Sequence, residues 1–190
     1  MPVIPSIHAP AACDGSHEMR IVLANRLYDG MKATIQASGE PEPATLSCKT
    51  TDIRFPLRQE AKYSEENLRA VLADPTLPYP ARMGASLGLA WYDRLKISPT
   101  VDITSYRLGP ATILHLPSEA FVEYQLFALS LRPNDFVAVA AYGELGTGYI
   151  CTDKAFAEGG YEPTASLVGP PTETLLKAAI REVLNDNGNR

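Results

Sequence analysis

The chain has 190 residues, with 17 Lys and Arg against 22 Asp and Glu, which gives a formal net charge of −5. An apolar fraction of 45% and a charged fraction of 21% are typical of a folded globular domain. The acidic balance, without a cluster of Lys or Arg, argues against a nucleic-acid partner. No uninterrupted apolar run approaches the ~20 residues of a transmembrane helix. We expect one domain over residues 1–190.

The cysteines and the N-terminus carry little chemistry. Cys13, Cys48 and Cys151 lie far apart and form no C-x-x-C, so we expect small buried side chains rather than a zinc knuckle or redox pair. The start, MPVIPSIHAPAACDG, lacks the basic and apolar segments of a signal peptide. It resembles the middle of a longer protein more than a natural beginning, and whether Met1 is the natural start is left open. The compartment is therefore left open.

Helical periodicity dominates the first hundred residues. Asp14 or Ser16 can cap a helix of about 20 residues, and its apolar face is formed by Met19, Val22, Leu23, Leu27, Met31 and Ile35. Residues 45–57 alternate as a strand, and a phase slip near Thr50 and Thr51 predicts a β-bulge.

Two further helices are predicted before residue 100. A short one covers 64–73, and a longer one begins at Pro80, a residue suited to the first helical position. The apolar stripe of the longer helix is formed by Met83, Leu87, Trp91 and Leu95. Gly84 and Gly88 lie beside it, one turn apart, and would allow close approach to a neighbouring element.

The second half predicts a parallel strand pair. Residues 101–108 and 111–116 read as strands joined by a turn, and 136–142 is apolar on both faces, as in a buried parallel strand. Ser118 would cap a largely buried helix, Glu119–Arg132, between the last two strands. The fold class is therefore α/β, a mixed sheet with helices packed on it, including a strand–helix–strand crossover at 111–142. A final amphipathic helix presents Leu175, Leu176, Ala179, Ile180, Val183 and Leu184 on one face.

The crossover also predicts where chemistry is placed. Parallel strands end at the same sheet edge, where open α/β sheets bind ligands, so Glu119 should approach the segment from Tyr142 to Tyr149. Glu119 and Glu123 lie four residues apart, on one face of the predicted helix. They are either functional carboxylates or part of a narrow solvated stripe, which the helix dipole favours near its N-terminus. His115 lies in an apolar strand and is either a hydrogen-bonded core residue or a ligand.

Several common site motifs are absent from the sequence. The Gly-rich segment 143–149 is followed by neither Lys-Ser/Thr nor a helix, so it is no Walker loop or dinucleotide fingerprint. Neither G-x-S-x-G nor H-E-x-x-H occurs. His8 and His17 fall in a loop and at a helix start, where a solvated side chain is expected.

The segment from Ile113 to Pro170 resembles a known family. ILHLPSEAFVEYQL and FVAVAAYGELGTGYICTDKAFAEGGYEPTASLVGP are similar to the later part of the catalytic domain of neutral/alkaline non-lysosomal ceramidases, closest to their bacterial relatives. CDGSHEMRIVLANRLYDGMKAT resembles the helix that precedes this region. The resemblance implies that Glu119, in Leu-Pro-Ser-Glu, and Tyr149, in Gly-Thr-Gly-Tyr, are zinc ligands. Ser118 stands where the family usually has Gly.

The resemblance also implies that something is missing. The family's other two zinc ligands are histidines from an earlier half of the domain, and His8, His17 and His115 do not match those motifs. The chain therefore looks like the C-terminal portion of a zinc-dependent amidohydrolase, a ceramidase-like hydrolase in which metal-activated water cleaves an N-acyl amide. An N-terminal half or a partner chain would complete the site.

Expectations for the isolated chain follow from the same comparison. Catalytic zinc typically has three protein ligands and prefers imidazole, so Glu119 and Tyr149 alone should bind zinc weakly. We therefore expect the isolated chain to hydrolyse amides negligibly. The substrate would be a small-molecule or lipid amide. Family members are often secreted. The alternative is a non-catalytic structural or binding domain that retains the scaffold without the metal.

Overall fold

The structure is a computed structural model that describes residues 16–37, 39, 44–143 and 146–185. The chain divides into two compact units, residues 1–43 and 44–190. In the first unit, helix α1 (His17–Ala37) confirms the predicted helix. The Ser16 hydroxyl accepts a hydrogen bond from the Met19 N–H at 3.1 Å, as a cap does. Asp14, the other predicted cap, lies outside the described residues.

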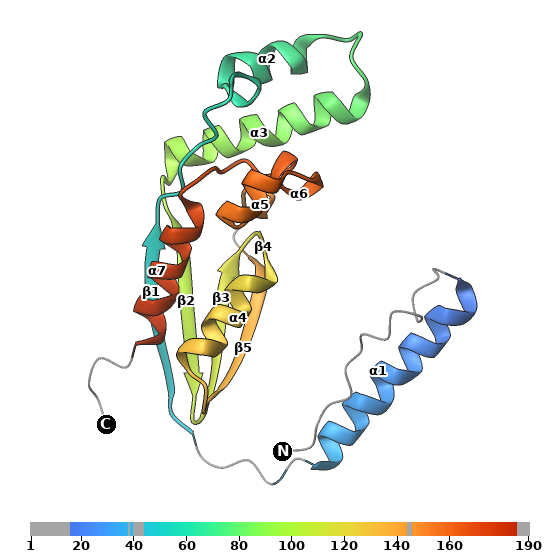
Figure 1. Ribbon diagram of the computed structural model, residues 1–190, viewed down its shortest axis with the longest axis vertical. Helices are drawn as coiled ribbons and strands as arrows, with labels where there is room; N and C mark the ends of the chain where they lie inside the picture. Colours follow the sequence, from blue (N-terminus) through green and yellow to red (C-terminus); the bar gives the residue numbers. More distant parts are fainter. Residues whose placement is uncertain (1–15, 38, 40–43, 144–145, 186–190) are drawn as a thin grey trace. The chain divides into compact units, whose positions relative to one another are not determined.

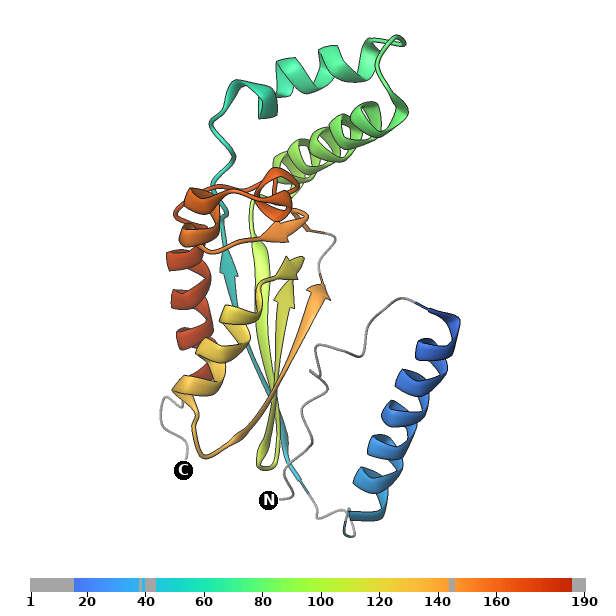
Figure 2. The same cartoon turned by 45° about the vertical axis from the view of Figure 1, so that its right-hand side comes forward.

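The second unit is built on a four-stranded mixed sheet, which confirms the predicted fold class (Figures 1 and 2). Its order is β1 (Leu46–Ile53), β2 (Val101–Leu108), β3 (Ala111–Pro117) and β5 (Phe136–Gly143). β1–β2 and β2–β3 are antiparallel, and β3–β5 is parallel. The predicted bulge in β1 is wrong, because all eight residues pair with β2 in continuous register.

The strand–helix–strand crossover is confirmed, but its helix starts later than predicted. α4 (Val122–Leu131) begins after Phe121, and residues Glu119–Ala120 form a short strand, β4. Ser118 is not a helix cap, because its φ of 56° is left-handed and its hydroxyl bonds elsewhere. α4 is also less buried than expected, since Val122 and Leu126 are exposed while Tyr124 and Ala128 are buried.

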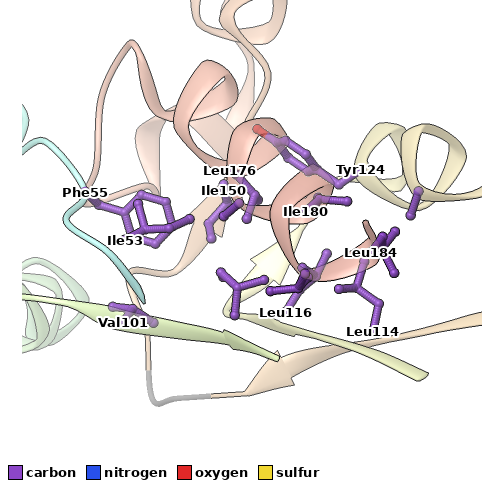
Figure 3. Packing of buried hydrophobic residues seen from close by; sticks show 14 of the residues in the cluster. Ile53, Phe55, Val101, Leu114, Leu116, Tyr124, Ile150, Leu176, Ile180 and Leu184 are labelled. Atoms are coloured by element: carbon purple, nitrogen blue, oxygen red, sulfur yellow. The ribbon is translucent and has the colours of Figure 1, made fainter. Parts of the chain in front are cut away.

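One face of the sheet is covered by helices and holds the hydrophobic core. α4 and α7 (Thr172–Leu184) contact each other and the strands on this face. The predicted apolar face of α7 is confirmed, because its Leu176, Ile180 and Leu184 belong to the same buried cluster as Leu114 and Leu116 of β3 (Figure 3). The core also contains a paired polar group: the Ser105 hydroxyl donates to the Val183 carbonyl at 2.8 Å.

A helical hairpin precedes β2. α2 (Glu65–Ala73) and α3 (Tyr79–Ile97) confirm the two predicted helices, and α2 follows the short 3-10 helix η1 (Ala61–Tyr63). The predicted α3 stripe is partly wrong: Trp91 is buried and Leu95 partly so, but Met83 and Leu87 are 47% and 60% exposed. The hairpin instead packs through Leu68, Ala85 and Leu89.

Gly88 and Gly84 differ in their surroundings. A Cβ atom at Gly88 would come within 2.8 Å of Leu68 Cδ1, so the predicted close approach is confirmed there. A Cβ atom at Gly84 would meet no atom of another element within 4 Å, so that half of the prediction is wrong. In the described part of the chain, no helix is long and apolar enough to span a bilayer.

Short elements complete the sheet edge where β3 and β5 end. β6 (Tyr149–Ile150) pairs with β4, and α5 (Asp153–Glu158) and α6 (Tyr161–Thr164) follow it (Figure 2). The Tyr124 hydroxyl donates to the Cys151 carbonyl at 2.9 Å, which ties α4 to this segment. This hydrogen bond connects the segment that follows β6 to the buried side of α4.

The other face of the sheet carries no helix of residues 44–143 and 146–185. We call it the open face, and its residues alternate with those of the core face: Leu46, Cys48, Thr50, Asp52, Asp102, Thr104, Tyr106, Leu108, Ala111, Ile113, His115, Phe136, Ala138 and Ala140. The prediction that strand 136–142 is buried on both faces is therefore wrong. β5 is an edge strand whose apolar residues occupy both a covered and an exposed side.

Candidate functional site

The structure places the two predicted ligands side by side. Glu119 in β4 and Tyr149 in β6 are direct register partners in a parallel strand pair. Backbone bonds hold this pair: the Glu119 N–H donates to the Gly148 carbonyl at 3.1 Å, and the Phe121 N–H to the Ile150 carbonyl at 3.2 Å. Both side chains are half-buried at the carboxyl edge of the main sheet.

Tyr149 and Glu119 also interact through their side chains. A hydrogen bond with the Glu119 carboxylate, then desolvation and the charge of that carboxylate, raise the pKa of Tyr149 above its ordinary value. The phenol therefore keeps its proton at neutral pH.

Aromatic rings surround Tyr149. Its ring lies edge-on to Phe121, with centroids 6.4 Å apart, and to Tyr161, with centroids 5.9 Å apart. Such edge-to-face pairs fix ring orientation as well as burying apolar area. The sequence indicated Tyr161 and Glu162 only through the family resemblance, and Phe121 was assigned to the helix. A prediction that started the helix after Phe121, as α4 does, would have left Phe121 in the strand segment beside Tyr149.

The turn into β4 is strained. Ser118 and Tyr142 both have left-handed φ angles, 56° and 68°, which non-glycine residues rarely adopt. Two backbone bonds hold them: the Tyr142 N–H donates to the Ser118 carbonyl at 2.7 Å, and the Ser118 N–H donates to the Gly143 carbonyl at 2.8 Å. The buried Ser118 hydroxyl accepts from the Thr147 N–H at 2.8 Å. This network fixes the direction in which the chain leaves β3 and therefore the position of Glu119 in β4.

Glycines make room for the same turn. A Cβ at Gly146 would lie 1.6 Å from the Ser118 hydroxyl oxygen, and one at Gly143 would lie 2.3 Å from the His115 imidazole. Gly148 has φ of 75°, and a Cβ there would lie 2.2 Å from the Ala165 carbonyl oxygen. We call residues 118–119 with 142–143 and 146–149 the corner. Its tight packing explains why this loop is rich in glycine.

Arg58 braces the segment behind the corner. Its guanidinium pairs with Glu60, donates to the Pro163 carbonyl at 2.6 Å and lies over the Tyr63 ring at 4.4 Å. The hydrogen bond from Arg58 lowers the pKa of Glu60 to about 2. Isolated bridges then join Leu57 to Val168 and Gly148 to Ser166, which connects Arg58 to β6 through the backbone.

Within the described residues, Glu119 and Tyr149 could supply only part of the ligand set of a zinc ion. No group of three or more His, Cys, Asp or Glu able to hold a metal occurs among residues 16–37, 39, 44–143 and 146–185. His115 is half-buried against Gly143, His17 is exposed at the start of α1, and His8 lies outside the described residues. Two oxygen donors do not make a zinc site by themselves.

An apolar hollow lies next to the pair. It encloses about 350 Å³ and is open to solvent. Its lining comes from β3, β4, α4 and β5: Leu116, Ala120, Phe121, Val122, Gln125, Val139, Ala141 and Tyr142. Because Ala120 and Phe121 follow Glu119 directly, the hollow adjoins the corner.

Comparisons with known proteins support the fold. No protein-family profile and no curated protein matches the chain. Among solved structures, it is similar to neutral ceramidase from Pseudomonas aeruginosa, with 16% identity, 93% of this chain and 33% of that chain covered, and a TM-score of 0.49. It is also similar to a ceramidase complexed with C2, with 16% identity, 85% and 33% covered, and a TM-score of 0.51. The latter likeness indicates a ceramidase-like fold, and the chain spans about a third of both structures.

Proposed function

We propose that this chain is part of a ceramidase-like, zinc-dependent amidohydrolase and supplies Glu119 and Tyr149 to the metal. The observation that carries the proposal is the register pairing of these two residues in β4 and β6. The family resemblance selects the same two residues that the ends of the parallel strands are expected to bring together. Their convergence at the carboxyl edge of a parallel pair is where α/β sheets bind ligands.

In this proposal the chain is incomplete by itself. Zinc would supply a metal-bound water of lowered pKa for attack on an amide. This chain's own contribution is positional: the strained turn at Ser118 fixes the backbone of Glu119, and the rings of Phe121 and Tyr161 orient Tyr149. Two imidazole ligands would come from a preceding segment or from a partner chain. A small-molecule or lipid amide is the proposed substrate, with its apolar part in the hollow beside Glu119.

Zinc content tests the proposal. We expect the chain alone to bind zinc weakly and substoichiometrically, and to bind about one zinc per complex when it is produced with a segment that carries two histidine motifs. Glu119→Gln and Tyr149→Phe should each lower zinc affinity and hydrolysis of an N-acyl amide in that complex. Glu123→Gln is the matched control, because Glu123 is an exposed carboxylate four residues away.

Two results would contradict this assignment. Tight stoichiometric zinc in the isolated chain would show that the ligand set is different. Full zinc binding by a complex that carries Glu119→Gln would remove Glu119 from the site.

A non-catalytic scaffold is the second candidate, and one observation favours it. Glu119 and Tyr149 are register partners in β4 and β6, and the nearby Glu119 carboxylate raises the pKa of the Tyr149 phenol, so the pair can serve to hold β4 against β6. In that role, Glu119→Ala would lower the melting temperature and leave no metal-dependent property to lose. The zinc titration and the melting experiment on the same variants separate the two candidates.

A further inference from the structure

The open face is apolar at the end near the β2–β3 turn. Two rows of cross-strand neighbours cover it: Leu46, Leu108, Ala111 and Phe136 in the first row, and Cys48, Tyr106, Ile113 and Ala138 in the second. Tyr106 and Phe136 are 42% and 65% exposed. At 150–250 Å² per aromatic side chain, these two rings expose on the order of 200 Å².

Aliphatic side chains extend this area. Leu46, Leu108 and Ile113 are each about half exposed. With them the patch enters the range of the largest patches on monomers, roughly 300–600 Å², which are often functional. Parallel strand pairs such as β3–β5 are also usually covered on both sheet faces. The patch therefore has the composition of an interface.

Charge is confined to the opposite end of the face. Asp52 and Asp102 are direct cross-strand partners, both exposed. Like charges in this position repel each other unless solvent or a cation screens them. Any partner that covers the apolar rows should therefore leave these carboxylates in water or meet them with positive charge.

We propose that the open face binds the same face of a second copy of this chain, sheet on sheet, about a two-fold axis perpendicular to the strands. Aligned sheets pack about 10 Å apart at an angle of about 30°. An axis between the two apolar rows places the first row of one copy over the second row of the other. Such an interface uses the same patch twice, as two-fold dimers do.

Residue sizes favour this arrangement. Phe136 then faces Ala138 of the second copy, Ile113 faces Ala111, and Leu46 faces Cys48, so large side chains meet small ones on three of the four strands. Interdigitation of large and small residues is what packed sheet interfaces require.

Charge favours the same axis. Asp52 and Asp102 extend past the turn at Gly109 and Pro110 of the other copy and stay in solvent. An axis parallel to the strands would instead place the carboxylates of both copies at the same end of the interface. Because only two rows interlock, the interface is smaller than the ~800 Å² per partner of standard complexes. We therefore expect a reversible dimer rather than a permanent one.

Sedimentation velocity over a range of concentrations tests the dimer. We expect wild type to pass from monomer to dimer in the micromolar range, and Ile113→Glu to move the midpoint to at least about tenfold higher concentration, as for a charge in an interface centre. Leu87→Glu, an exposed leucine on α3, is the control and should behave as wild type. Circular dichroism melts establish that each variant is folded.

A swap of two residues tests the geometry. Phe136→Ala leaves a gap and Ala138→Phe brings two phenylalanines together, so each should weaken the dimer. The double variant restores one large and one small residue at each contact and should recover most of the affinity. Additive losses in the double variant would exclude this axis.

Thiol labelling provides a readout that needs no substitution on the face. With Cys13→Ser and with Cys151 buried, Cys48 is the accessible thiol of this chain. Alkylation of Cys48 should slow as concentration rises and should regain its monomer rate in Ile113→Glu. A wild-type protein that stays monomeric through high micromolar concentration overturns the proposal. So does Cys48 protection at the lowest concentration, which would mean that the same chain covers the face.

Discussion

The helix-covered face of the sheet and the corner at its edge are built by different physics. On the covered face, large apolar side chains such as Leu114, Leu176 and Ile180 are fully buried, and α7 needs only its amphipathic pattern to dock there. In the corner, few large side chains are buried. Its shape depends on two left-handed residues, Ser118 and Tyr142, and on a buried hydroxyl that accepts a backbone hydrogen bond.

The two regions therefore serve different purposes: one stabilises the domain, and the other positions individual side chains. Burial of apolar area is non-directional, so the covered face holds the domain together without specifying the position of any one polar atom. Hydrogen bonds and φ angles are directional, so the corner can fix Glu119 opposite Tyr149. Substitutions in the two regions should therefore fail differently, in global stability for the first and in local geometry for the second.

The largest effect should come from two neighbours on β3. Leu114 is fully buried and Ile113 is 45% exposed on the open face. Leu114→Ala should cost about 2–5 kcal/mol of unfolding free energy, as in other buried leucines. Ile113→Ala should cost less than about 1 kcal/mol when measured at a concentration where the chain is monomeric. Urea unfolding measures both. Equal losses would mean that the open face is covered within one chain.

Gly148→Ala should have the next largest effect, and it should be local at first. The alanine would have to adopt φ of 75° and place its Cβ 2.2 Å from the Ala165 carbonyl oxygen. Left-handed strain and overpacking together should cost about 2–4 kcal/mol. Amide exchange of Glu119, which bonds to the Gly148 carbonyl, should accelerate more than that of the β2–β3 ladder. Gly84→Ala on α3, where the new Cβ would meet no atom of another element within 4 Å, is the control and should be neutral or stabilising.

The contrast also explains what the sequence could predict. The apolar face of α7 follows from periodicity because its partners lie on one side, and strong apolar character in 111–116 and 136–142 correctly indicated a parallel pair. Met83 and Leu87 continue the helical stripe of α3, yet they are exposed. The hairpin packs instead through Leu68, a residue of another helix, and single-helix periodicity does not contain that information.

The corner was harder to predict for the same reason. Ser118 has the composition of a helix cap, but its hydroxyl accepts from Thr147, which is 29 residues away. The approach of Glu119 to Tyr149 was anticipated from parallel strand ends, although Glu119 lies in β4 and not in the helix. Family resemblance alone supplied their proposed role as ligands, and that role stays a prediction.

Two substitutions of Ser118 isolate backbone strain from hydrogen bonding. Ser118→Ala and Ser118→Gly both remove the acceptor of the Thr147 N–H, but only alanine keeps a Cβ at φ of 56°. The glycine variant should be more stable than the alanine variant by about 1 kcal/mol, the cost of the left-handed conformation. Thermal melts give the difference. An alanine variant as stable as the glycine variant would show that the turn relaxes and that the corner is not rigid.

The smallest effect tests where the corner ends and the core begins. Cys151 directly follows β6, and burial raises the pKa of its thiol to about 11. A thiol that stays neutral in the fold favours folding until the unfolded chain begins to ionise near its ordinary pKa of about 8.5. Stability should therefore fall as pH rises from about 9 towards 11, by on the order of 1 kcal/mol. Cys151→Ala should lose this slope between pH 9 and 10, because the buried Tyr124, whose pKa is raised in the fold, contributes only above the ordinary tyrosine pKa of about 10, where the unfolded chain begins to ionise. If the unfolding free energies of wild type and Cys151→Ala fall equally between pH 9 and 10, the Cys151 thiol is accessible to water. The solvent-accessible region at the corner would then extend past β6 towards the core.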